Sequence, residues 1–169
     1  MQRTPWVERK FQLDLPPGWI YNVLERLHGT VPRLQHMLRD FEEEKTTIKP
    51  GGAWSIREHI GHLHDLEELQ FQRIDDFVNR RSVLRAADMQ NIKTYEAGYN
   101  ERPSGELIKK LDATRALLIS KFAALDDETQ SFQSLHPRLQ VMMRPVDLVY
   151  FTAEHDDHHL ATIRELIRH

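Results

Sequence analysis

The C-terminal stretch from Val146 to Ile167 constrains the fold of this chain more than any other segment. Its apolar residues recur every three or four positions, which places them on one face of an α-helix. Two histidines, His155 and His159, fall in the middle of that face. A buried neutral imidazole costs free energy unless its lone pair has a partner. The stretch therefore predicts a core-facing helix surface that carries two imidazoles in need of a partner.

The two histidines are four residues apart, so their Cβ atoms lie roughly 6 Å apart on one helix face. That spacing allows both rings to approach one transition-metal ion. The alternative is a pair of core histidines satisfied by hydroxyl or backbone groups, which an isolated H-x-x-x-H motif in a histidine-rich chain does not exclude. A third ligand on a facing helix would favour the metal site. On the same helix, Glu154 and Asp157 are expected to face solvent.

Length, charge and cysteine content narrow the function classes. The 169 residues suit a single domain spanning 1–169. Acidic and basic residues are interspersed and the net charge is −3, so no basic face indicates a nucleic-acid partner. The chain has no cysteine, which leaves His, Asp and Glu as metal ligands. No run approaches the roughly 20 apolar residues of a membrane span, and the N-terminus lacks a signal-peptide pattern. We therefore expect a cytoplasmic protein without a membrane partner.

Helical periodicity recurs in three more segments, which predicts an all-α four-helix bundle. The four expected helices are 19–44, 55–81, 104–125 and 145–167. Gly29 and Pro32 predict a kink in the first. Ser55 and Glu58 form a capping-box pattern at the start of the second, and Ser104 is the expected cap of the third. Residues 82–103 would form a long crossover and one wall of a pocket, and residues 126–143 are expected to be irregular.

The second helix offers the third imidazole. His59 is predicted near the centre of its inward face and His62 toward one edge. Three imidazoles from two facing helices would leave one metal position open to water or substrate. Imidazole ligands without sulfur suit Zn, Ni, Fe or Cu, of which we expect Zn or Ni. Arg115, close to the inward face of the third helix, either covers apolar surface with its stem or binds an anionic substrate.

Two motifs resemble a known family. The segments W-S-I-R-E-H-I-G-H-L-H-D-L-E (54–67) and A-E-H-D-D-H-H-L-A-T-I (153–163) are similar to the DinB-like, YfiT-related superfamily of four-helix-bundle metal-dependent enzymes. The resemblance extends from the F-Q-L-D-L-P-P-G lead-in (11–18) through the H-P pair (136–137) to the last helix. It implies that His62, His155 and His159 are the metal ligands, with His59 the fallback for His62.

The resemblance also assigns roles to the neighbouring polar residues. His64 and His158 differ from the residues common at these positions in the family, and we expect each to be either peripheral to the site or in contact with a ligand from behind. Asp65 and Glu67 would be either solvated helix residues or carboxylates that orient an imidazole.

The family resemblance implies an activity on small molecules. Characterised relatives include transferases and isomerases in which the metal activates a low-molecular-weight thiol such as bacillithiol or mycothiol. The implied reaction is metal-assisted transfer of such a thiol to an electrophile, or a related hydrolysis. Two other functions remain open: a non-catalytic metal-binding stress-response protein, and a structural dimerisation bundle with core histidines. A homodimer also remains open, with an exposed arm around Trp6 as one contributor.

Overall fold

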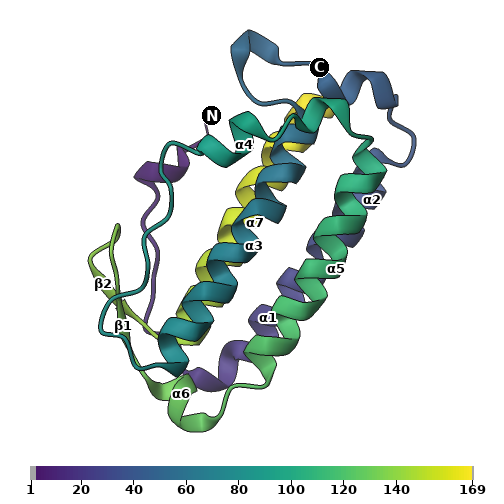
Figure 1. Ribbon diagram of the computed structural model, residues 1–169. Coiled ribbons are helices and arrows are strands. Elements are labelled where there is room, and N and C mark those ends of the chain that lie inside the picture. Colours follow the sequence, from purple (N-terminus) through teal and green to yellow (C-terminus); the bar gives the residue numbers. More distant parts are fainter. Residues whose placement is uncertain (1–2, 169) are drawn as a thin grey trace.

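A computed structural model describes residues 3–168. Residues 1, 2 and 169 of the expected domain, 1–169, lie outside the described part. The chain folds as the expected four-helix bundle (Figure 1). The helices are α1 (Ile20–His28), α2 (Thr30–Leu38), α3 (Ile56–Val78), α4 (Ile92–Glu96), α5 (Ser104–Ala123), α6 (Asp127–Ser131) and α7 (Pro145–Arg168). Two short strands, β1 (Ser134–His136) and β2 (Val141–Met143), pair in antiparallel fashion. No helix within residues 3–168 combines the length and apolar character needed to cross a membrane.

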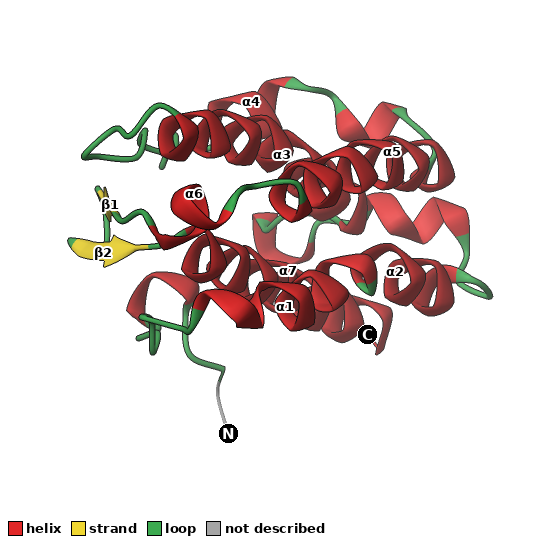
Figure 2. Ribbon diagram, turned by 90° about the horizontal axis from the view of Figure 1, so that it is seen from below, coloured by secondary structure: helices red, strands yellow, loops and turns green. Residues whose placement is uncertain are grey.

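The bundle helices are arranged in two rows, α3 with α5 and α7 with α1 and α2 (Figure 2). α3 and α5 run in the same direction. Arg57, at the start of α3, donates to the carbonyl of Asn100 just before α5, and Arg80, just after α3, donates to the carbonyl of Glu128 just after α5. The connection from α3 to α5 must therefore return along the whole bundle, as the crossover beside α3 and α7 does in Figure 1. This is the long crossover that the sequence predicts.

The first predicted helix is broken where expected. α1 ends at His28 and α2 begins at Thr30, with Gly29 as the junction. Pro32 lies in the first turn of α2. Backbone N–H groups in a first turn have no partner within the helix, so the N–H that proline lacks costs no hydrogen bond there. α2 ends at Leu38, before the predicted residue 44, and the chain then forms a 3₁₀ helix over 43–47.

The capping prediction holds for α3 and is wrong for α5. The Ser55 hydroxyl accepts from the Glu58 amide at 3.1 Å, and the Glu58 carboxylate accepts from the Ser55 amide at 2.8 Å. At α5 the N-cap is Pro103, and both the amide and the hydroxyl of Ser104 donate to Glu43. Ser104 thus ties the start of α5 to the loop after α2.

Residues 126–143 are more regular than predicted. They contain α6 and the β1–β2 hairpin, in which His136 pairs with Val141. The hairpin continues into α7 at Pro145. The missed hairpin matters because its turn, residues 137–140, brings polar side chains to the pocket described below.

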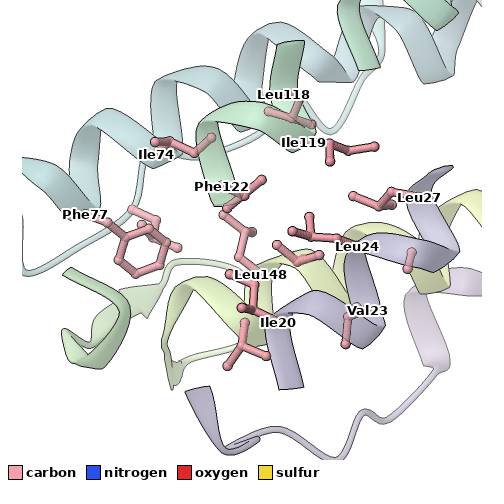
Figure 3. Close-up of a cluster of buried hydrophobic side chains, with 14 residues drawn as sticks. Ile20, Val23, Leu24, Leu27, Ile74, Phe77, Leu118, Ile119, Phe122 and Leu148 are labelled. Atoms are coloured by element: carbon pink, nitrogen blue, oxygen red, sulfur yellow. The ribbon is translucent and has the colours of Figure 1, made fainter. Parts of the chain in front are cut away.

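The core consists of two apolar clusters separated by a polar layer. Figure 3 shows the cluster near the α1 end, whose members include Leu27, Phe77, Leu118, Phe122 and Leu148. The second cluster includes Leu34, Ile60, Leu63, Leu111 and Ile163. The polar layer takes one buried side chain each from α2, α3, α5 and α7: Thr30, Glu67, Arg115 and Asp156.

Candidate metal centre

The three predicted histidines come together between α3 and α7. His62, His155 and His159 each offer a ring nitrogen, and these nitrogens all lie within 4.8 Å of one another. The Nε2 atoms of His155 and His159 are 3.1 Å apart. His62 and His159 are each only 5% exposed, and His155 is half-buried.

The donor geometry fits a tetrahedral divalent ion. With Zn–N bonds of roughly 2.05 Å, two nitrogens on one tetrahedral ion lie about 3.3 Å apart. The Nε2 atoms of His155 and His159 are close to this separation, and the His62 nitrogen lies within 4.8 Å of both rings' donors. Three nitrogen donors fill three of the four positions, so a fourth position would face the adjoining cavity.

A chain of hydrogen bonds fixes the orientation of His62. Its Nδ1 lies 3.1 Å from the Thr94 hydroxyl, which donates to the Asp65 carboxylate at 3.1 Å. The Tyr99 hydroxyl donates to the other Asp65 oxygen at 2.6 Å. Because Thr94 uses its only proton toward Asp65, it must accept from Nδ1–H of His62. The Nε2 lone pair of His62 is then free for a cation, and Asp65 acts as the orienting carboxylate.

Gly61 makes room for this chain of hydrogen bonds. The Tyr99 ring lies against the α3 backbone so closely that a Cβ at Gly61 would be 2.4 Å from ring atoms. A larger residue at this position would push the ring outward. Tyr99 would then lose its reach to Asp65.

His59 supports a neighbouring imidazole and lies outside the three-histidine cluster. Its Nδ1 is 2.8 Å from Nδ1 of His159, so one ring donates to the other. If His159 offers its Nε2 lone pair to a cation, its Nδ1 carries the proton and donates to His59. Of the two sequence candidates for the third nitrogen, the geometry places His62 in the cluster and His59 behind His159.

The cluster is held in its neutral form. Burial lowers the pKa of His62 to about 4 and that of His59 to about 4, while His155 and His159 have pKa values well below the usual 6.5, again chiefly because of burial. Neighbouring imidazoles lower the pKa of His155 and His159 further. Neutral imidazoles keep the lone pairs that a metal ion needs.

Arginines on the far side of α7 fix its rotation. Glu154 accepts from Arg9 and Arg26, and Asp157 accepts from Arg26 and Arg33. The prediction that these two carboxylates face open solvent is wrong, because both are partly buried against α1, α2 and the N-terminal arm. With this side anchored, the histidines of α7 face α3.

Two tryptophans flank the histidines. The Trp54 ring centroid lies 4.7 Å from that of His62 and 6.1 Å from that of His159. The Trp6 ring lies 4.9 Å from His155 and 5.1 Å from Phe151. The Trp6 ring therefore packs against α7, while its neighbours Pro5, Val7 and Glu8 are exposed, as expected for this arm.

A cavity of about 560 Å³ adjoins the histidine cluster. α3 and α7 form two of its walls, residues 86–89 and Asn91 of the crossover form a third as predicted, and residues 136–138 of the hairpin close one end. Trp6 and Val7 of the N-terminal arm also border it. Such a volume is typical of small-molecule sites.

The polar layer forms part of the cavity floor. Arg115 is 3% exposed and donates to Glu67 at 2.7 Å and also to Asp156, which accepts a further bond from Thr30. Neither sequence interpretation of Arg115 is correct: its guanidinium is paired with carboxylates in the core. Burial raises the pKa of Glu67 to about 7, and its Oε2 is buried without a partner.

His64 and His158 lie outside the three-histidine cluster, and the His158 ring centroid is 5.5 Å from that of His159. His64 is half-buried outside the cluster, and His158 packs against Trp6 while its carbonyl accepts from Arg3. No local sequence pattern points to the contacts of Thr94, Tyr99 or Trp6 with the site, because these contacts join residues far apart in the chain. The only sequence signal for such contacts is the presence of aromatic residues near the histidine motifs.

Comparisons with known proteins agree with this architecture. The solved structure described as "YfiT from Bacillus subtilis is a probable metal-dependent hydrolase with an unusual four-helix bundle topology" superposes with a TM-score of 0.79 at 16% identity, covering 95% of this chain and 93% of that one. The mycothiol-dependent maleylpyruvate isomerase superposes with a TM-score of 0.68 at 10% identity, covering 90% of this chain and 63% of that one. At such identities these similarities show the fold. A search of curated proteins found no match.

The sequence itself supplies the family assignment. The sequence model of the DinB superfamily matches residues 23–163, from α1 to within α7. The match includes all three histidines of the cluster and the hairpin. Because it spans most of the chain, this protein belongs to the DinB superfamily.

Proposed function

We propose that this chain is a metal-dependent enzyme acting on small molecules, a thiol S-transferase or a related hydrolase, with His62, His155 and His159 as the ligands of a divalent ion. The observation that carries the proposal is the convergence of three neutral imidazoles at the wall of a cavity of about 560 Å³. Zn or Ni is the expected ion. When bound, such an ion would lower the pKa of a thiol or water in its open position.

The chain's own residues would prepare the site in three ways. The carboxylate of Asp65, acting through Thr94, holds the His62 lone pair toward the cluster. Trp6, Trp54 and Phe151 line the cavity beside the histidines and reduce contact with water. Glu67 lies five residues after His62, about 7.5 Å along α3. Its unpartnered Oε2 and raised pKa suit it to hold or release a proton near neutral pH.

The two other functions account for fewer of these features. A structural bundle would bury its histidines in packed core, whereas His62 and His159 border a cavity. A non-catalytic metal-binding stress-response protein would not need a roomy cavity that includes an unpaired carboxylate oxygen. Both functions predict no turnover and are therefore excluded by any metal-dependent activity.

The test is thiol consumption by protein loaded with Zn or Ni. Bacillithiol, mycothiol, glutathione and cysteine would each be offered with a chromogenic electrophile, and p-nitrophenyl esters would test hydrolysis. We expect one combination to turn over with wild type and His64→Ala and to lose at least about 100-fold in rate with His159→Ala. Equal rates for wild type and His159→Ala, or no turnover with any combination, would contradict the proposal.

A further inference from the structure

Three hydrogen-bond donors line the cavity beside Phe151, about one turn of α7 from His155. Arg73 of α3 and His136 of β1 are each only 2% exposed, and Arg138 follows in the hairpin turn. All three side chains border the cavity. They belong neither to the histidine cluster nor to the Arg115 layer.

Within residues 3–168, neither arginine is paired with a carboxylate. Arg73 donates only through Nε, to the carbonyl of Arg85 at 3.1 Å. A terminal nitrogen of Arg138 is buried without any partner. The carboxylate that acts on the pKa of Arg73 is that of Asp76, which accepts hydrogen bonds from the backbone N–H of Arg85 at 2.9 Å and from its guanidinium at 3.0 Å.

His136 adds a third donor. Its Nδ1 accepts from the Leu139 amide at 3.2 Å, so the neutral ring carries its proton on Nε2. That Nε2 is buried and has no acceptor among the described residues. Two guanidinium groups and one imidazole N–H therefore present donors to the same space.

Such an arrangement is costly without an anion. Burial lowers the pKa values of His136 and Arg73. The three groups are also close enough for Arg73 and Arg138 to lower the pKa of His136 further, and for Arg138 to lower that of Arg73. A buried charge normally has a hydrogen-bonded counter-charge, because desolvation is otherwise uncompensated. A guanidinium presents a planar fork of donors that matches the two oxygens of a carboxylate.

We propose that Arg73, His136 and Arg138 form an oxyanion subsite, which receives a carboxylate or similar group of the molecule whose reactive end lies at the three-histidine cluster. This inference rests on the proposed function in one respect, that the cavity holds the substrate. His136 and Arg138 both pack against Phe151, which precedes His155 by about one turn of α7. The anionic group of the ligand would therefore lie beyond Phe151 from the reacting atoms.

The wall of the cavity defines the rest of the ligand. Leu66 and Leu69 of α3 and Met89 of the crossover line the cavity and suit an apolar or aromatic body. Gln70 also lines it, with a buried Oε1 that has no partner and can accept from a hydroxyl or amide of the ligand. The predicted substrate class is an amphipathic organic anion.

A matched pair of fluorescent probes tests the subsite. The sulfonate 8-anilinonaphthalene-1-sulfonate and its neutral analogue N-phenyl-1-naphthylamine share an aromatic body and differ in charge. Both would be titrated into folded, metal-free protein, so that no ion at the histidines can bind the sulfonate. We expect the sulfonate to bind at least about tenfold more tightly, the effect of one charge-assisted hydrogen bond. Equal affinities would overturn the proposal.

Variants locate the charge preference. Arg138→Gln should weaken sulfonate binding about tenfold or more and leave the neutral probe unchanged, whereas Arg164→Gln, on the exposed side of α7, should change neither. Arg73→Gln should act like Arg138→Gln, and Arg138 is the safer variant because it is only half-buried. An unchanged sulfonate preference in Arg138→Gln and Arg73→Gln would contradict the assignment.

Competition identifies which molecule carries the anion. Succinate, which lacks a thiol, and glutathione, which has two carboxylates, would each compete with the bound sulfonate at millimolar concentration. The stronger competitor indicates whether the electrophile or the thiol carries the anion, and displacement by neither contradicts the subsite.

Because the protein is metal-free, a sulfonate preference that depends on Arg138 would survive failure of the metal proposal. Metal-dependent turnover would likewise survive failure of the subsite.

Discussion

His59 and His159 meet through their Nδ1 atoms at 2.8 Å, which makes one imidazole the hydrogen-bond partner of another. In the sequence, His59 competes with His62 as a ligand because it is nearer the centre of the inward face. In the structure it supports His159 from behind and leaves His62 in the cluster. A hydrogen bond to the remote ring nitrogen fixes the tautomer of a ligand and its orientation.

Removing that support should weaken metal binding without abolishing it. His59→Leu deprives His159 of its partner, and we expect about a 10- to 100-fold loss of metal affinity, measured by competition with a chromogenic chelator. His59→Gln keeps a side-chain acceptor and should recover part of the loss. A complete loss of binding in His59→Leu, with His62→Ala unaffected, would show that the two histidines have the opposite roles.

The Thr94 hydroxyl should matter through His62 alone. Thr94→Val removes the acceptor for Nδ1–H of His62 and the link to Asp65, and we expect metal affinity to fall at least about tenfold. Thr94→Ser keeps the hydroxyl and should bind metal like wild type. Chelator competition measures both variants. Equal affinities for Val and Ser at this position would mean that the hydrogen-bond chain does not orient the ring.

The Arg115 layer should be important for stability. Arg115→Met leaves the carboxylates of Glu67 and Asp156 buried without their shared cation, which should cost about 3–5 kcal/mol of the free energy of unfolding. Arg164→Met, on the exposed face of α7, is the matched control and should change this free energy by less than about 0.5 kcal/mol. Urea unfolding at pH 7 measures both. A variant at Arg115 as stable as the control would show that the carboxylates become protonated at little cost.

Acid should destabilise the metal-free protein over a defined range. Burial lowers the pKa of His59, His62 and His136 to about 4, whereas histidines in the unfolded chain titrate near 6.5. The unfolded state therefore binds more protons between these values, so stability is full above pH 6.5 and falls as pH drops toward 4. Below about pH 4 this contribution levels off. Urea unfolding between pH 7.5 and 4.5 measures the slope.

A single variant separates His136 from the other histidines. His136→Gln should decrease the number of protons taken up on unfolding by up to about one over the same pH range. The raised pKa of Glu67 has the opposite effect, because it makes the folded state bind more protons than the unfolded state. This effect is the same in wild type and in His136→Gln, so it does not change the difference between their pH slopes. An identical pH slope for wild type and His136→Gln would show that His136 titrates normally in the folded chain.

The sequence predicts the bundle well because helix periodicity, the Ser55 capping box and the break at Gly29 are local signals. His155 and His159 are likewise recognisable, since their i, i+4 spacing puts them on one face whatever packs against it. The choice between His59 and His62 depended on family resemblance. Helix periodicity alone favours His59, whereas the cluster of ring nitrogens contains His62, because it lies toward the cavity side of the bundle and away from the centre of the apolar face.

Other features were not accessible from local patterns. Pairing of Arg115 with Glu67 and Asp156 joins three helices across the core, so no spacing rule along the chain indicates it. The hairpin of residues 134–143 was missed because its strands are three residues long, too short for a clear period-two pattern. Arg73 and Arg138 line the same cavity only because the hairpin turn folds over it, and no local sequence pattern indicates that arrangement.

The metal content of purified protein tests the central claim most directly. Wild type and His64→Ala, purified in parallel from medium supplemented with Zn and Ni, should each carry about one equivalent of divalent metal per chain by elemental analysis, and His159→Ala should carry almost none. Comparable unfolding curves would confirm that all three proteins are folded. Metal-free wild type that also fails to take up Zn or Ni in titration, or His159→Ala that binds as much as wild type, would contradict the three-histidine site.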